Sequence, residues 1–185
     1  KLLHLLEETH SLPFKWLFAN PALGWLYLER GDLAAAQTCL RESVAFCQAG
    51  GDNPPELYVR ALLVQVACKA GELEEATGHM QRAREIFSLS PDWLGLAAEV
   101  HLAEGVLATA QQRWPEAEAA FQEAVEVNRQ YHLPYYESRT LLEWWKMYFA
   151  RNGRGDREKV IEFLDQAVAI FQRVQAKKMV EKVLA

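Results

Sequence analysis

The sequence predicts an all-α fold, a right-handed solenoid of about four helical hairpins with partial helices at its two ends. A short pattern recurs along the chain: a glycine or other turn residue, a short turn, an alanine and then a large apolar residue. Its copies start at positions 31, 71, 112 and 155, which are 40, 41 and 43 residues apart. A nearly fixed period of this size is typical of stacked units that bury their apolar faces against one another. No period-two alternation persists anywhere, so no sheet is expected.

The clearest copy runs from Gly71 to Ala76. Because two helices approach most closely where side chains are small, the alanines of the pattern are expected at helix crossings. These alanines are Ala36, Ala76 and Ala117. The large residues that follow are expected to fill the space between units, and they are Leu40, Met80, Phe121 and Leu164.

The N-terminal region carries two helical signals. Residues 1–10 place leucines on one side and look like the end of a helix whose beginning is missing. Asn20-Pro21 is a helix start, with Asn20 as the N-cap and proline in the first position. Residues 12–19 then form either a separate helical segment or the first part of a helix that kinks at Pro21.

The remaining helices follow from helix starts and stops along the chain. Ser90-Pro91 is interpreted as a helix start of the same kind as Asn20-Pro21. The stretches 50–55 and 152–155 are interpreted as breaks between helices. The expected helices cover residues 33–48, 56–70, 73–87, 91–111, 115–131, 134–150 and 156–174. Residues 176–185 either cap the solenoid or begin a truncated fifth unit, with their apolar residues on one side.

Composition excludes several classes of function. The chain has 185 residues, half of them apolar, and a net charge of −5 without a basic cluster, so direct nucleic-acid binding is not expected. No apolar run approaches the ~18 residues of a membrane span. Three cysteines without metal spacing indicate reduced thiols in a cytoplasmic protein. The chain starts without methionine, and we expect a single domain over residues 1–185 that is a fragment of a larger protein.

No motif indicates an enzyme, a metal site or a cofactor. The five histidines lack ligand spacing, and no glycine-rich phosphate loop is present. His101 and Glu104 lie one helical turn apart, but an interhelical or solvated histidine is a far commoner explanation than an acid–base pair. We therefore predict a non-catalytic protein without cofactors.

The residues around the turns identify a known repeat. Leu23, Gly24 and Tyr27 precede Gly31 by eight, seven and four positions, and Gly105 occupies the place of Gly24 in the third unit. Together with the alanine pattern after each turn, this resembles the tetratricopeptide (TPR) repeat. The resemblance covers nearly the whole chain, although the period exceeds the typical ~34 residues. This long form is similar to the TPR regions of MalT-like transcription regulators and of related bacterial regulatory ATPases and cyclases.

The resemblance implies a binding groove on the concave face. Carried over position by position, the family pattern implies a partner-binding groove lined by Trp25, Leu28, Tyr58, Gln65, Lys69, Val106, Thr109, Trp145, Lys146 and Phe149. Trp144 and Trp145 point in different directions because they are adjacent on a helix. We expect Trp145 in the groove, partly exposed, and Trp144 buried between helices.

Two functions are compatible with these features. The first is a protein-interaction scaffold, which holds a peptide, a protein helix or another domain of the same chain in bacterial signalling or transcription regulation. The alternative is a ligand-sensing module, with a small molecule or short peptide in the groove. An enzyme would require an unexpected cluster of titratable groups in a pocket.

Overall fold

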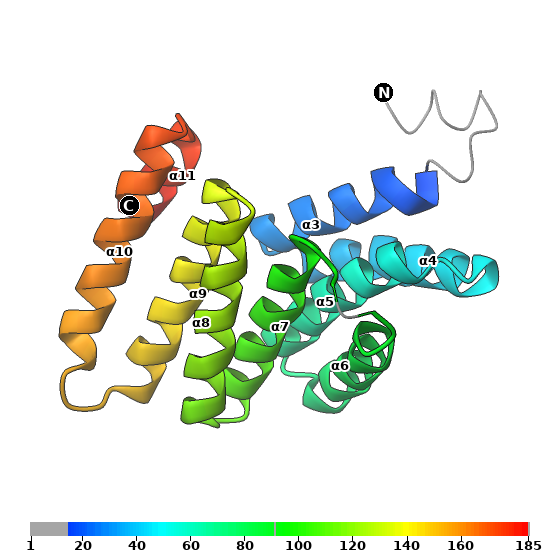
Figure 1. The fold of residues 1–185 in the computed structure, drawn as a ribbon, viewed down its shortest axis with the longest axis horizontal. Coiled ribbons are helices and arrows are strands. Elements are labelled where there is room, and N and C mark those ends of the chain that lie inside the picture. The colour runs from blue at the N-terminus through cyan, green and yellow to red at the C-terminus, as the bar shows by residue number, and fades with distance from the viewer. Residues whose placement is uncertain (1–14, 91, 185) are drawn as a thin grey trace. The chain divides into compact units, whose positions relative to one another are not determined.

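The fold is entirely helical in the part of the chain that the structure, a computed structural model, describes: residues 15–90 and 92–184 (Figure 1). No strand occurs among these residues. The chain divides into two compact units, residues 1–91 and 92–185. Each unit contains two helical hairpins, so the predicted all-α class built from about four hairpins is confirmed. The partial helix expected over residues 1–10 lies outside the described residues.

The first unit consists of one short π-helical turn and two hairpins. The turn η1 spans Lys15–Ala19, and the hairpins pair α3 (Asn20–Arg30) with α4 (Leu33–Gly50) and α5 (Asn53–Ala70) with α6 (Leu73–Phe87). Consecutive helices pack on each other, as the colour sequence from blue to green shows in Figure 1. Their shared core includes Leu28, Leu40, Leu62 and Leu63. The apolar side of each helix is therefore buried against the helices next to it in the chain.

The second unit repeats this arrangement and adds a short helix. Its hairpins pair α7 (Leu96–Ala110) with α8 (Trp114–Gln130) and α9 (Pro134–Arg151) with α10 (Asp156–Arg173). Helix α11 (Lys177–Leu184) follows and places three apolar side chains against the core of the unit, namely Met179, Val180 and Val183. The centre of this core is aromatic and contains Phe121, Trp144, Phe163 and Phe171.

Six of the connections between helices share one turn geometry. In each, a residue with positive φ follows the helix, and the N–H of the next residue donates to a carbonyl five residues earlier, as from Asp32 to Tyr27 (3.0 Å) and from Arg113 to Ala108 (2.8 Å). This is the Schellman geometry, which satisfies the last carbonyls of a helix. The positive-φ residues are Gly31, Gly51, Gly71, Gln112, His132 and Gln175. Gln112 thus takes the place that glycine holds in the first two units, as the repeat frame requires.

Small residues permit close helix approach at the predicted positions. Ala36, Ala76 and Ala117 are completely buried. A Cβ atom placed on Gly105 would lie 2.6 Å from the Phe121 ring, and one on Gly24 would lie 2.5 Å from Leu40. Each glycine therefore makes room for the large apolar residue of its partner helix in the same hairpin.

The helix start at Asn20-Pro21 was predicted incorrectly. The chain is already helical before Pro21, since η1 runs directly into α3 and Ala19 has helical dihedral angles. Asn20 does not cap the helix; it is buried, and its side-chain amide donates to Glu42 on α4 at 3.2 Å. Stacking of Trp16 on Phe46 (centroids 6.4 Å apart) holds η1 against α4. Of the two alternatives for residues 12–19, the described part, 15–19, forms a π-helical extension of α3.

The predicted start of α7 and the fourth repeat frame also need correction. Helix α7 begins at Leu96 rather than near Pro91, because Asp92 accepts a hydrogen bond from the Leu94 N–H (2.7 Å) and Leu94 adopts a positive φ. In the fourth unit, Phe163 rather than Leu164 is the buried large residue. The turn after α9 is longer, with Asn152 as its positive-φ cap and Gly155 just before α10, yet Ala167 is completely buried, as the repeat pattern predicts.

Candidate partner-binding surface

In the first unit, the predicted groove residues have unequal access to solvent. Leu28 and Gln65 are buried, at 2% and 3% exposure, and the Gln65 amide donates to the Ala61 carbonyl within its own helix. These two residues support the fold and do not offer a contact surface. Trp25 and Tyr58 are half-buried against the core, and Lys69 is exposed in the last turn of α5.

In the second unit, the predicted groove residues lie on two helices that contact each other. Val106 and Thr109 are half-buried on α7, and Trp145, Lys146 and Phe149 lie on α9. Phe149 is 70% exposed, although it is a large apolar residue. Its ring meets the half-buried Trp145 ring edge-on, with centroids 5.9 Å apart and an angle of 70° between the ring planes. We call Trp145 and Phe149 the α9 aromatic surface.

The neighbouring tryptophan has the opposite environment. Trp144 is 9% exposed and stacks on Phe163 of α10 at 4.6 Å and on Phe121 of α8 at 6.1 Å. Adjacent helix residues point about 100° apart, which sends these two side chains to different faces. Trp144 is buried and Trp145 is half-buried, as the repeat pattern predicts. Whether Trp145 contacts a partner stays a prediction.

A positively and a negatively charged residue lie beside the α9 aromatic surface. Lys146, one residue after Trp145, is exposed and forms an ion pair with Glu143 at 2.7 Å. Exposed pairs of this kind contribute little to stability, so both charges can exchange this contact for one with a partner. A large exposed aromatic group beside polar residues is a usual feature of interaction sites.

One comparison with known proteins identifies the repeat. Residues 55–130 match the family model described as tetratricopeptide repeat. This stretch is therefore similar to tetratricopeptide repeats. The matched segment runs from the first turn of α5 to the end of α8 and includes the glycine turn at Gly71 and the Gly105–Phe121 packing. No curated protein matches the chain significantly.

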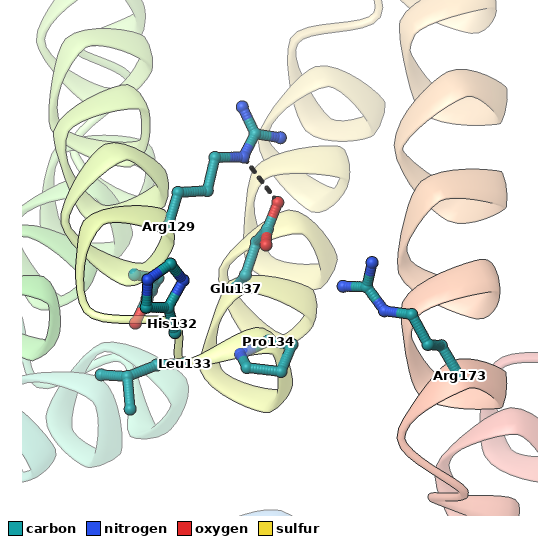
Figure 2. Close-up of a pocket in the computed structure, with 7 residues that line it drawn as sticks. Arg129, His132, Leu133, Pro134, Glu137 and Arg173 are labelled. Carbon is teal, nitrogen blue, oxygen red and sulfur yellow. Dashed lines mark hydrogen bonds and ion pairs between the residues drawn. The ribbon is translucent and has the colours of Figure 1, made fainter.

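The structure also contains a cavity that no sequence motif predicts. It has a volume of about 370 Å³ and lies in the second unit, where the ends of α8, α9 and α10 meet (Figure 2). Its lining residues are Asn128, Arg129, His132, Leu133, Pro134, Glu137 and Arg173. None of them belongs to the predicted groove. They come from two separate segments, residues 128–137 and the end of α10, and no local motif marks them.

Two buried carboxylates, Glu56 and Glu99, form ion pairs that link neighbouring helices inside the units. In the first unit, the Glu56 carboxylate accepts from Arg60 at 2.7 Å and from Arg82 of α6 at 3.3 Å. In the second, Arg139 of α9 donates to Glu99 of α7 at 3.1 Å, with both side chains almost fully buried. Removing one member of such a pair leaves a buried charge, so these pairs fix helix register.

The titratable groups of the described residues show no arrangement for catalysis. Burial raises the pKa of the Cys47 thiol to about 11 and that of Cys68 to about 12, so both stay protonated and weakly nucleophilic at neutral pH. All three cysteines are free thiols. His101 and Glu104 form a pair at 3.1 Å on one helix. Within the described residues, no group of histidine, cysteine and acidic side chains could hold a metal ion, and no helix has the length and hydrophobicity needed to cross a bilayer.

Proposed function

We propose that this chain is a non-catalytic scaffold that binds a peptide or a protein helix through the α9 aromatic surface. Tetratricopeptide repeats generally mediate protein–protein interaction, and the match of residues 55–130 to this family supports such a role. The observation that carries the proposal is the 70% exposure of Phe149 beside the half-buried Trp145. Burying two aromatic rings in a partner gains much apolar area at a low cost in side-chain entropy.

The biological setting that we propose is a cytoplasmic bacterial regulator of the MalT-like kind. In this setting the repeats act as one domain, and the partner is another protein or another domain of the same polypeptide. Val106, Thr109 and Lys146 then complete the contact around the two rings, while the half-buried Trp25 and Tyr58 and the exposed Lys69 supply the contacts of the first unit. A direct role in nucleic-acid binding is not part of this proposal, since the net charge of the chain is −5.

The proposal is tested with displayed libraries of extended and helical peptides selected on the whole chain. The enriched peptides are then titrated against three variants: Trp145→Ala, Phe149→Ala and Ile161→Ala. Ile161 is a matched control, because it is also a large apolar residue, 53% exposed, but lies on α10. We expect Trp145→Ala to weaken binding by at least about 2 kcal/mol and Ile161→Ala to leave it unchanged.

Trp144→Ala separates a binding effect from a folding effect. Because Trp144 lies between three aromatic rings, this change should lower the free energy of unfolding by roughly 3–5 kcal/mol in urea titrations. Trp145→Ala should stay folded and lose less stability, because Trp145 is only half-buried against the core. If the selected peptides bind Trp145→Ala and Phe149→Ala as tightly as wild type, the α9 aromatic surface is not the binding site.

The alternative function, a ligand-sensing module, gains a specific observation from the cavity at the ends of α8, α9 and α10. The residues that line this cavity differ from those of the predicted groove. A small molecule would therefore bind at the hairpin ends.

A further inference from the structure

The cavity of the second unit has a floor of buried polar groups and a charged rim. Asn128 and Glu137 are 2% and 8% exposed, and Arg129, His132 and Arg173 are exposed around them. Leu133 and Pro134 supply the apolar part of the lining, and Figure 2 shows Pro134 between Leu133 and Arg173. A volume of about 370 Å³ is within the range of small-molecule sites, roughly 300–1,000 Å³.

Glu137 is a mostly buried carboxylate with one oxygen bonded to the protein and the other open to the cavity. Its Oε1 atom accepts from the Nε atom of Arg129 at 2.7 Å. No residue in the described part of the chain bonds the second oxygen, Oε2. A buried carboxylate favours additional donors, because each hydrogen bond offsets part of the cost of its lost hydration.

Arg173 is the complementary group on the opposite wall. It is the last residue of α10, and Figure 2 shows its side chain extending toward Glu137 without an ion pair between them. Within the described residues, Arg173 has no carboxylate partner. A guanidinium and a carboxylate thus face the same cavity from two helices but do not neutralise each other.

We propose that this cavity binds a small zwitterion, a molecule with an ammonium group and a carboxylate a few bonds apart, as in free α-amino acids. The ligand carboxylate pairs with the Arg173 guanidinium, whose planar donors match a carboxylate. The ligand ammonium donates to Oε2 of Glu137. The side chain of the ligand lies against Pro134.

The charges of the cavity favour a zwitterion over other small ligands. A phosphate dianion would meet the Glu137 carboxylate, and like charges at short range are unfavourable. A simple cation would meet Arg129 and Arg173. An uncharged apolar molecule would remove water from these groups without replacing its hydrogen bonds. The N-terminal end of α9, which begins at Pro134, also favours the carboxylate through the helix dipole.

This site is separate from the α9 aromatic surface. Glu137 and Trp145 lie on the same helix, eight residues apart, which corresponds to about 12 Å along its axis. The two proposals therefore stand on different residues. Variants at Arg173 test the cavity without touching Trp145 or Phe149.

The experiment is calorimetric titration of the whole chain with free L-amino acids, grouped by side-chain class, at concentrations up to the low millimolar range. An amino acid that binds is then compared with its N-acetyl and C-terminal amide derivatives, which lack the ammonium charge and the carboxylate respectively. We expect each derivative to bind at least about tenfold more weakly, since a charged hydrogen bond is worth roughly 1.5–3 kcal/mol. Acetate and inorganic phosphate are the simple-anion controls.

The matched variants are Arg173→Gln and Arg157→Gln. Both residues are exposed arginines of α10, but Arg157 lies at the other end of the helix, about 24 Å away along the axis. Arg173→Gln should lose at least about tenfold in affinity and keep the wild-type unfolding midpoint, whereas Arg157→Gln should bind normally. The proposal is overturned if no amino acid binds, if acetate or phosphate binds as tightly, or if Arg173→Gln binds like wild type.

Discussion

At the scale of single residues, Asp156 shows how a side chain at a helix start stabilises a turn. Its carboxylate accepts from Nη2 and Nε of Arg151, at 2.6 and 2.9 Å, and from the Gly153 N–H at 2.6 Å. Hydrogen bonding by Arg151 lowers the pKa of Asp156 below its ordinary value of 3.8, against the opposing effect of burial. The bond to Gly153 adds to this lowering and holds the long turn between α9 and α10.

This lowered pKa predicts a pH-dependent loss of stability. The contribution of Asp156 is fully present above pH 3.8, its ordinary pKa, and is lost as the pH falls through the lower value in the folded state. Asp156→Asn should therefore cost about 1 kcal/mol at neutral pH, and its difference from wild type should shrink in strongly acidic solution. Urea midpoints measured across this range test the prediction. Asp165→Asn, at an exposed position of the same helix, should differ little from wild type at any pH.

The burial of single residues was predicted correctly from sequence where it depends only on which face of a helix a residue occupies. Trp144 and Trp145 were separated correctly because adjacent helix residues necessarily point apart. Asn20 was misassigned because Asn-Pro is a helix start only if the preceding chain is not helical, and residues 15–19 are π-helical. The prediction of Leu164 in place of Phe163 was wrong because Phe163 is buried by stacking on Trp144 of α9, a contact between helices that local sequence does not show.

At the scale of elements, the turns between helices recur in each repeat, and a substitution in one of these turns should stabilise the protein. Gln112 occupies a positive-φ position, with φ of 58°, where glycine stands at Gly31 and Gly71. A residue with a Cβ atom is strained there by about 1–2 kcal/mol, so Gln112→Gly should stabilise the protein by about 0.5–1 kcal/mol. The measurement is the shift in the thermal or urea midpoint.

The same substitution inside a helix provides the control for this prediction. Gln122 is exposed in the middle of α8, and Gln122→Gly should destabilise the protein by up to about 1 kcal/mol through lost helix propensity. Opposite signs at positions 112 and 122 would establish the positive φ as the cause. Equal destabilisation at both positions would contradict the Schellman geometry at Gln112.

Helices and turns were predictable from sequence to the extent that local chemistry determines them. Proline at a helix start and glycine after a helix end placed α4, α5, α6, α8 and α9 within a few residues. The start of α7 was missed because a non-glycine residue with positive φ, Leu94, has no sequence signature. The cavity was missed for a different reason: Arg129, Glu137 and Arg173 meet only through the packing of three helices.

At the scale of the whole molecule, each unit has a core of its own. One apolar cluster is confined to residues 25–66 and includes Leu63, which is 1% exposed. Another is confined to residues 102–183 and includes Phe171, which is completely buried and meets Tyr135 edge-on at 5.7 Å. In repeat proteins, stability is approximately a sum of unit and nearest-neighbour terms, so a core mutation acts most strongly near its own site.

This local coupling predicts where a core mutation opens the molecule. Phe171→Ala should cost roughly 3–5 kcal/mol, because it leaves a large cavity beneath α9, α10 and α11. Hydrogen exchange of backbone amides should then accelerate in α9 and α10 and stay close to wild type in α3 and α4. Leu63→Ala should produce the reverse pattern, with a cost of roughly 2–5 kcal/mol. If either variant accelerated exchange equally in all these helices, the chain would unfold as a single cooperative body, and the two cores would not be independent sources of stability.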